Sequence, residues 1–134
     1  MEGLLNRIKE DLNADVVAIA EWKKKEASIQ WTCATGMTNQ RYRHMHILYG
    51  LGIVGKVMQA DRAMYYPDKQ EAEHDPLVNA ESLESLFLVP LSAGTSLPSV
   101  LLVGYRREVE LPGEQEWGSW KGPLQEALKG ERRI

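Results

Sequence analysis

The 134-residue sequence contains one cysteine, Cys33, which excludes an internal disulfide and a cysteine-based zinc cluster. No apolar run approaches the roughly 20 residues that a membrane-spanning helix needs. The N-terminus lacks a basic segment followed by a long apolar stretch that would mark it for export, so we expect a cytoplasmic protein that does not bind membranes. Acidic residues (19) outnumber basic residues (16), and the net charge of −3 leaves no basic footprint for nucleic acid.

The composition is that of a globular chain, with 43% hydrophobic and 26% charged residues. A chain of this length usually organises one hydrophobic core, because two cores would each be too small. We therefore expect residues 1–134 to form a single domain.

Apolar side chains recur with helix or strand spacing along most of the chain. Leu4, Leu5, Ile8 and Leu12 share one helical stripe and predict a helix over 3–12. A glycine-rich turn at 50–55 opens a short helix, and a last helix begins at 111–114 and carries Trp117, Trp120, Leu124 and Leu128. The predicted strands are 16–22, 27–34, 63–66, 86–91 and 100–105, with a turn at 92–99. Consecutive hairpins favour an α+β fold, a mainly antiparallel sheet with the terminal helices on one face.

Residues 27–34 alternate in the manner of a half-buried strand, which places Trp31 and Cys33 on one face. Trp31 should therefore point into a covered region. In this setting we interpret Cys33 as a small apolar group rather than a nucleophile.

The stretch 68–84 holds six acidic residues and one lysine, Lys69, without a clear period. We interpret it as a long surface excursion that could contain a helical turn, of the kind that often serves as a functional lid. The negative charge of this segment would repel a bound anion, so its carboxylates would have to face water.

The second face of the sheet also needs a cover, which the helix after Gly52 and the loops 36–50 and 67–85 could supply. A cavity beneath them is the natural ligand site. The indole N–H of Trp31, the helix-start amides of Ile53 and Val54, and the pair Tyr65–Tyr66 would offer uncharged donors with apolar walls. Such a site suits a weakly hydrated small anion better than a phosphate, which would normally recruit arginine or lysine.

Three histidines, His44, His46 and His74, have no spacing that indicates a metal site. Arg41 and Arg43 could contact a ligand, although such arginines are usually solvated. The glycines at 50–55 match neither the dinucleotide-binding pattern nor a P-loop, and no nucleophile–base pair is evident. We therefore expect no catalytic residues and no metal.

The ordered set formed by the 50–55 turn, the 63–66 strand, the Asp75-Pro76 loop and the 86–105 hairpin resembles a GAF domain over almost the whole chain. Within that family, three segments in sequence are similar to the nitrate receptors of the Nre type: Trp31-Thr32-Cys33-Ala34-Thr35-Gly36, Asn39-Gln40-Arg41-Tyr42 and Gly52-Ile53-Val54-Gly55.

This resemblance implies a cytoplasmic, non-enzymatic nitrate sensor that controls an oxygen-sensing histidine kinase. It further implies no cofactor beyond the bound anion and a homodimer formed through the helices behind the sheet. It places nitrate beside Trp31 and the backbone of Ile53 and Val54, with Leu83 as an apolar wall and Tyr66 among the ligand-binding residues.

Two alternatives from other classes remain. One is a free methionine sulfoxide reductase of the GAF type that relies on Cys33, although that branch uses several cysteines. The other is a dimerisation module without a ligand. The cyclic-nucleotide-binding signature Asn-Lys-Xaa-Xaa-Phe-Asp-Glu is not found in the sequence.

Overall fold

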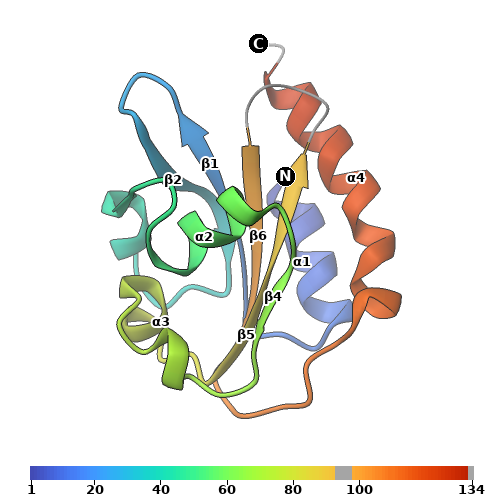
Figure 1. Ribbon diagram of the computed structural model, residues 1–134. Coiled ribbons are helices and arrows are strands. Elements are labelled where there is room, and N and C mark those ends of the chain that lie inside the picture. The colour runs from blue at the N-terminus through green and yellow to red at the C-terminus, as the bar shows by residue number, and fades with distance from the viewer. Residues whose placement is uncertain (93–97, 133–134) are drawn as a thin grey trace.

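The computed structural model describes residues 1–92 and 98–132, and it is built on a six-stranded antiparallel sheet of order β3-β2-β1-β6-β5-β4 (Figure 1). The strands are β1 (Val16–Lys23), β2 (Ser28–Thr35), β3 (His46–Ile47), β4 (Met64–Tyr66), β5 (Ser85–Ser92) and β6 (Pro98–Tyr105). The predicted α+β class and antiparallel sheet are confirmed. Of the predicted 92–99 turn, residues 93–97 lie outside the described residues.

The first and last helices, α1 (Glu2–Asp11) and α4 (Glu114–Arg132), cover one face of the sheet, as predicted (Figure 1). Their apolar stripes pack on alternate strand residues in what we call the helix-side cluster, which comprises Leu5, Ile8, Leu12, Val17, Ile19, Phe87, Val89, Leu91, Leu101, Val103, Tyr105, Trp117, Leu124 and Leu128. Within the described ranges, no helix is both long and apolar enough to cross a membrane.

The other face is covered by α2 (Gly52–Ala60), α3 (Pro76–Ala80) and two 3-10 turns, η1 (Arg41–His44) and η2 (Gln70–Ala72). Their buried side chains form the pocket-side cluster, which comprises Val16, Ala18, Ala20, Ile29, Trp31, Tyr42, Ile53, Val54, Val57, Met58, Tyr66, Ala72, Leu77, Val78, Leu83, Leu86, Leu88, Val100 and Leu102. The 68–84 stretch is therefore more ordered than a surface excursion, because it contains η2 and α3 and buries apolar residues of its own.

A β-bulge in β2 overturns the prediction that Trp31 and Cys33 share a face. Ile19 of β1 pairs with Cys33, whereas the next residue, Ala20, pairs with Trp31, so Thr32 is an extra residue in β2. An extra residue shifts the two-residue alternation by one position. Trp31 consequently packs in the pocket-side cluster, while Cys33 is half-buried against the helix-side cluster.

Candidate functional site

The five residues predicted to bind a ligand lie in one buried cluster. Trp31, Ile53, Val54, Tyr66 and Leu83 are all members of the pocket-side cluster, although they come from β2, α2, β4 and the segment before β5. The structure thus brings together residues as far as 52 positions apart in the sequence, from Trp31 to Leu83. Their contact with a ligand stays a prediction.

The Trp31 indole is the most unusual group in this cluster. Its side chain is only 4% exposed, and its Nε1–H is the one buried side-chain donor or acceptor among the described residues that has no hydrogen-bond partner. Trp117 and Trp120 instead donate to Tyr65 Oη at 3.1 Å and to Asp11 Oδ2 at 2.8 Å. A buried donor without a partner costs about 1–3 kcal/mol. Trp31 therefore presents a donor that a small acceptor would stabilise.

The N-terminal turn of α2 offers further donors on the same face of the sheet. Its N-cap residue is Leu51, which has no side-chain acceptor, so no side chain caps the first amides of the helix. A Cβ on Gly55 would lie 2.5 Å from the Leu48 carbonyl oxygen and 2.9 Å from the Gly50 nitrogen. Glycine at position 55 therefore lets the preceding loop pack directly against the helix.

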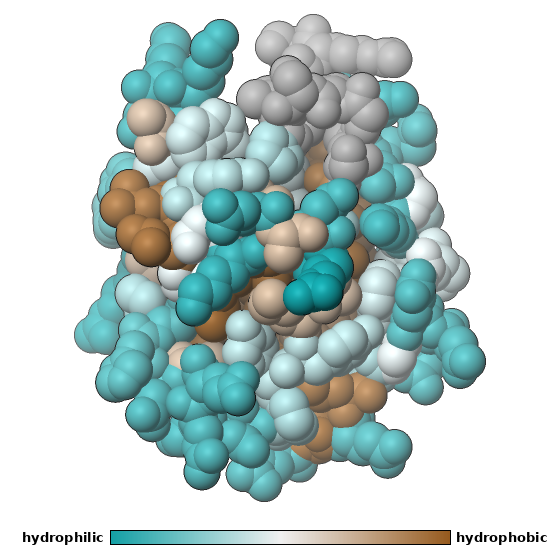
Figure 2. Space-filling view, in the orientation of Figure 1, coloured by the Kyte–Doolittle hydropathy of each residue, from teal (hydrophilic) through white to brown (hydrophobic). Residues whose placement is uncertain are grey.

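An open groove of about 240 Å³ reaches the start of α2 from the surface. Its lining residues come from α2 and from the segment before α3: Gly52, Ile53, Lys56, Glu71, Ala72, His74, Asp75 and Pro76. Figure 2 shows this side of the molecule, where hydrophilic side chains cover most of the surface and hydrophobic ones are visible between them near its middle. Ile53 belongs both to the groove and to the buried cluster.

Only one tyrosine of the predicted pair faces the cluster. Tyr66 is buried there, and its pKa is raised from 10.0 by burial and then by the nearby Glu71 and Asp75 carboxylates, so it stays a neutral phenol. Tyr65 points to the opposite face, where it stacks on Phe87 with 5.8 Å between ring centroids. Successive strand residues alternate between faces, which is why the pair separates.

The cationic candidates lie outside the cluster. Arg41, Arg43, His44, His46 and His74 are exposed. In the part of the chain that the structure describes, no group of three or more histidine, cysteine, aspartate or glutamate residues could hold a metal ion.

Two carboxylates of the acidic segment face inward, which corrects the expectation that all six must face water. Asp75 caps α3 by accepting hydrogen bonds from the Leu77 and Val78 amides, and its burial raises the pKa above its usual value of 3.8. Glu81 is only 2% exposed. These two carboxylates are therefore fixed within the fold, unlike the exposed acidic residues of the segment.

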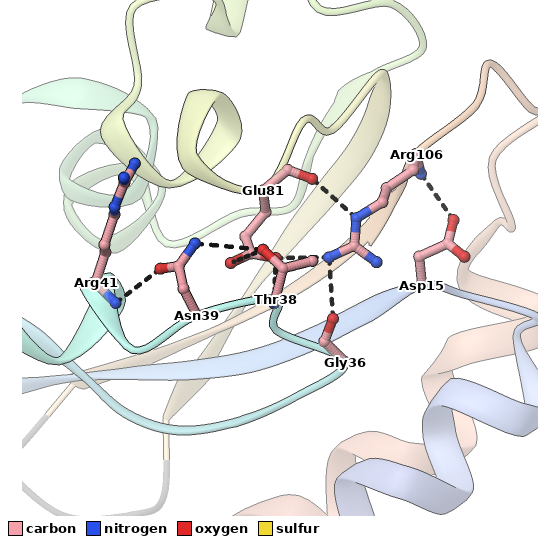
Figure 3. Close-up of polar contacts among 7 residues, drawn as sticks. All are labelled: Asp15, Gly36, Thr38, Asn39, Arg41, Glu81 and Arg106. Atoms are coloured by element: carbon pink, nitrogen blue, oxygen red, sulfur yellow. Dashed lines mark hydrogen bonds and ion pairs between the residues drawn. The ribbon is translucent and has the colours of Figure 1, made fainter.

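Glu81 belongs to a polar network that sequence reasoning missed (Figure 3). It pairs with Arg106 Nη2 at 2.5 Å and accepts from the Thr38 backbone N at 2.8 Å. Glutamate in an acidic loop and arginine after a strand both resemble solvated surface residues, so the sequence holds no local signal for their contact.

Comparisons with known proteins point to one fold. No protein-family model and no curated protein sequence matches the chain. Among solved structures, NreA from Staphylococcus aureus, mutated in its nitrate-binding site, matches with a TM-score of 0.74 and 28% identity over 84% of this chain and 87% of that one.

Two further solved structures extend the comparison. The GAF domain of an Acinetobacter phosphoenolpyruvate-protein phosphotransferase matches with a TM-score of 0.77 and 16% identity, over 98% of this chain and 81% of that one. Free methionine-R-sulfoxide reductase from Neisseria meningitidis matches with a TM-score of 0.70 and 14% identity, over 96% of this chain and 73% of that one. At such low identity these two show a shared fold alone. The similarity to NreA supports a GAF-type ligand sensor, and the chain has a GAF fold that resembles NreA.

Proposed function

We propose that the protein is a non-enzymatic receptor for nitrate, or for another small oxyanion of similar shape, and that it modulates a sensor histidine kinase. The observation that carries the proposal is the buried Trp31 Nε1–H without an acceptor. It lies in the cluster that also contains Ile53 and Val54 from the uncapped start of α2. The similarity to NreA, whose nitrate-binding site has been studied by mutation, supports the choice of anion.

The chemistry of these groups favours a weakly hydrated anion. The donors are an indole N–H and helix-start amides, which are neutral, and the cluster around them is apolar. A neutral donor gains from an anionic acceptor, and the positive end of a helix dipole favours negative charge. A phosphate, with more charge to desolvate, would require arginine or lysine side chains in the cluster.

Signalling would follow from a population shift. A ligand that binds one arrangement of α2 and the 67–85 segment better than another shifts the protein toward that arrangement. The kinase, by contacting one arrangement preferentially, would be coupled to the anion reciprocally. The proposal includes a cytoplasmic location and a homodimer formed through α1 and α4.

The methionine sulfoxide reductase alternative lacks a thiol in the right place. Cys33 is the only cysteine in the sequence, and the β-bulge turns it away from the pocket-side cluster. The similarity to the Neisseria reductase is one of fold at 14% identity.

Isothermal titration calorimetry of the purified chain with sodium nitrate tests the proposal, with sodium chloride at the same ionic strength as the control. We expect saturable binding of nitrate and none of chloride. Absence of heat and of any thermal shift up to millimolar nitrate would refute the receptor proposal. Autophosphorylation of the sensor kinase from the same organism, measured with this protein in the presence and absence of nitrate, tests whether the protein modulates the kinase. An unchanged rate would refute that part of the proposal.

A further inference from the structure

Trp31 Nε1 is shut off from solvent in this structure. The side chain is 4% exposed and its Nε1 atom is fully buried, so an anion can reach it only when a covering segment moves. Two segments contribute buried side chains to the same cluster as Trp31: the end of α3 with the residues that follow it, and the connection after β2 that leads into η1. What holds these segments in place should therefore govern ligand exchange.

A partly buried ionic network joins the two segments to each other (Figure 3). The Glu81 carboxylate, just after α3, accepts hydrogen bonds from the Thr38 backbone N at 2.8 Å and from Thr38 Oγ1 at 3.1 and 3.2 Å. Arg106 Nη2 donates to Glu81 Oε1 at 2.5 Å and to the Gly36 carbonyl oxygen at 2.9 Å. We call Gly36, Thr38, Glu81 and Arg106 the Glu81 latch.

The latch is anchored to the central sheet. The Arg106 backbone N donates at 2.7 Å to Oδ2 of Asp15, which lies just before β1. The Arg106 side-chain Nε donates to the Glu81 carbonyl oxygen at 2.9 Å. One arginine therefore ties the ends of β2 and α3 to the junction of β1 and β6. Because Arg106 donates to both the backbone and the side chain of Glu81, the position of that residue is fixed twice.

Leu83 follows Glu81 by two residues and depends on the same anchor. Its side chain packs where Gly104 of β6 has no Cβ: a Cβ there would lie 2.7 Å from Leu83 Cδ1. The Glu84 backbone N then donates to the Tyr105 carbonyl oxygen at 2.7 Å. The residues on both sides of Leu83 are thus fixed to the end of β6 and to Arg106.

The Glu81 side chain is 1% exposed and the Arg106 side chain 31%, so the hydration that the carboxylate loses offsets much of the attraction between the two charges. The use of such a pair can lie in specifying one arrangement. We propose that Glu81 is a positioning residue that holds Leu83 and the post-β2 connection closed over the ligand and so sets the rate of nitrate exchange. This inference rests on the proposed function. Opening the latch would release both segments together and expose the path to Trp31.

The direct test measures the rates of nitrate binding and release in Glu81→Gln. Stopped-flow tryptophan fluorescence records binding after mixing with sodium nitrate and release after dilution. The amide keeps the shape of the side chain and removes the charge that pairs with Arg106. We expect nitrate release to be at least tenfold faster, with weaker affinity. The matched control is Glu84→Gln, which removes a surface carboxylate that pairs with Lys69 at 3.3 Å. It should release nitrate within twofold of the wild-type rate.

A purely structural role for Glu81 would lower the unfolding temperature without altering nitrate release, and that result would overturn the proposal. If Glu81→Gln does not fold, Thr38→Val replaces it. That variant removes the hydroxyl contacts with Glu81 while it keeps the ion pair, and its release should be about threefold faster or more. Wild-type release in a folded Thr38→Val would then overturn the inference.

Amide hydrogen exchange separates failure of this inference from failure of the proposed function. Without nitrate, Glu81→Gln should exchange faster in both 36–44 and 77–84, because one latch holds both segments. Faster exchange in 77–84 alone would show that the segments open independently and would refute the latch. If the wild-type chain binds no nitrate, the proposed function fails, while joint exchange of the two segments would still establish the latch.

Discussion

Replacement of Trp31 by phenylalanine should separate stability from ligand binding. The substitution removes the buried donor, whose missing partner costs about 1–3 kcal/mol. The smaller ring leaves a void of roughly 30 Å³, about the volume of one water, and such a void costs about 0.7 kcal/mol at ~24 cal/mol per Å³. The apolar atoms removed cost about 0.8 kcal/mol more in lost burial, taken as roughly one buried CH₂. Without nitrate, these magnitudes place the stability of the variant between about 0.5 kcal/mol below and about 1.5 kcal/mol above that of the wild type.

Nitrate should stabilise the wild type more than the variant. A hydrogen bond to a charged acceptor contributes about 1.5–3 kcal/mol, so Trp31→Phe should bind nitrate about 10- to 150-fold more weakly. Thermal unfolding with and without sodium nitrate measures both effects, since about 1 kcal/mol corresponds to roughly 4 °C for a chain of this size.

The matched control is Trp117→Phe. The Trp117 indole already donates to Tyr65 Oη, so its loss breaks a hydrogen bond that is made and should lower stability. Nitrate affinity should be unchanged, because Trp117 lies in the helix-side cluster. If Trp31→Phe is destabilised as Trp117→Phe is, and keeps its response to nitrate, the reasoning about the buried donor is wrong.

Three further substitutions test other parts of the account. Gly55→Ala places a Cβ 2.5 Å from the Leu48 carbonyl oxygen, so it should lower the unfolding free energy by about 1–3 kcal/mol and weaken nitrate binding in calorimetry, whereas unchanged affinity would exclude the α2 start from the site. Asp75→Ala removes the α3 cap and should cost about 1 kcal/mol in denaturant unfolding, while Asp75→Asn keeps the cap. Because burial raises the Asp75 pKa above 3.8, the protonated carboxyl should contribute most to stability below that pH, and the contribution should be lost as pH rises through the folded-state pKa, a dependence that the asparagine variant should lack. Cys33→Ala should bind nitrate with wild-type affinity, and thiol-dependent turnover abolished by this change would instead support a reductase.

Short-range patterns were sufficient for most of the fold. The helix stripe of Leu5 and Ile8 and the long apolar strands are local signals, and the antiparallel order follows from consecutive hairpins. The same reasoning could have found α3, because aspartate followed by proline is a typical N-cap and first helical residue. The acidic composition of the segment concealed that signal.

The errors arose where tertiary structure overrides local patterns. Strict alternation assigned Cys33 to the face of Trp31, and one bulged residue, Thr32, reversed it. The contact between Glu81 and Arg106 joins residues 25 positions apart and depends on burial, which charge patterns do not indicate. The candidate ligand-binding set rests on one face assignment for Trp31, which the bulge did not alter.

Nuclear magnetic resonance of the indole groups tests directly whether the Trp31 Nε1–H donates to bound nitrate. In a ¹⁵N–¹H spectrum, assigned with Trp31→Phe, sodium nitrate should move the Trp31 Nε1–H resonance downfield as the N–H gains an anionic acceptor. The Trp117 and Trp120 resonances should stay in place, because these indoles already donate to Tyr65 and Asp11. A Trp31 resonance that does not move while nitrate saturates the protein would contradict the account.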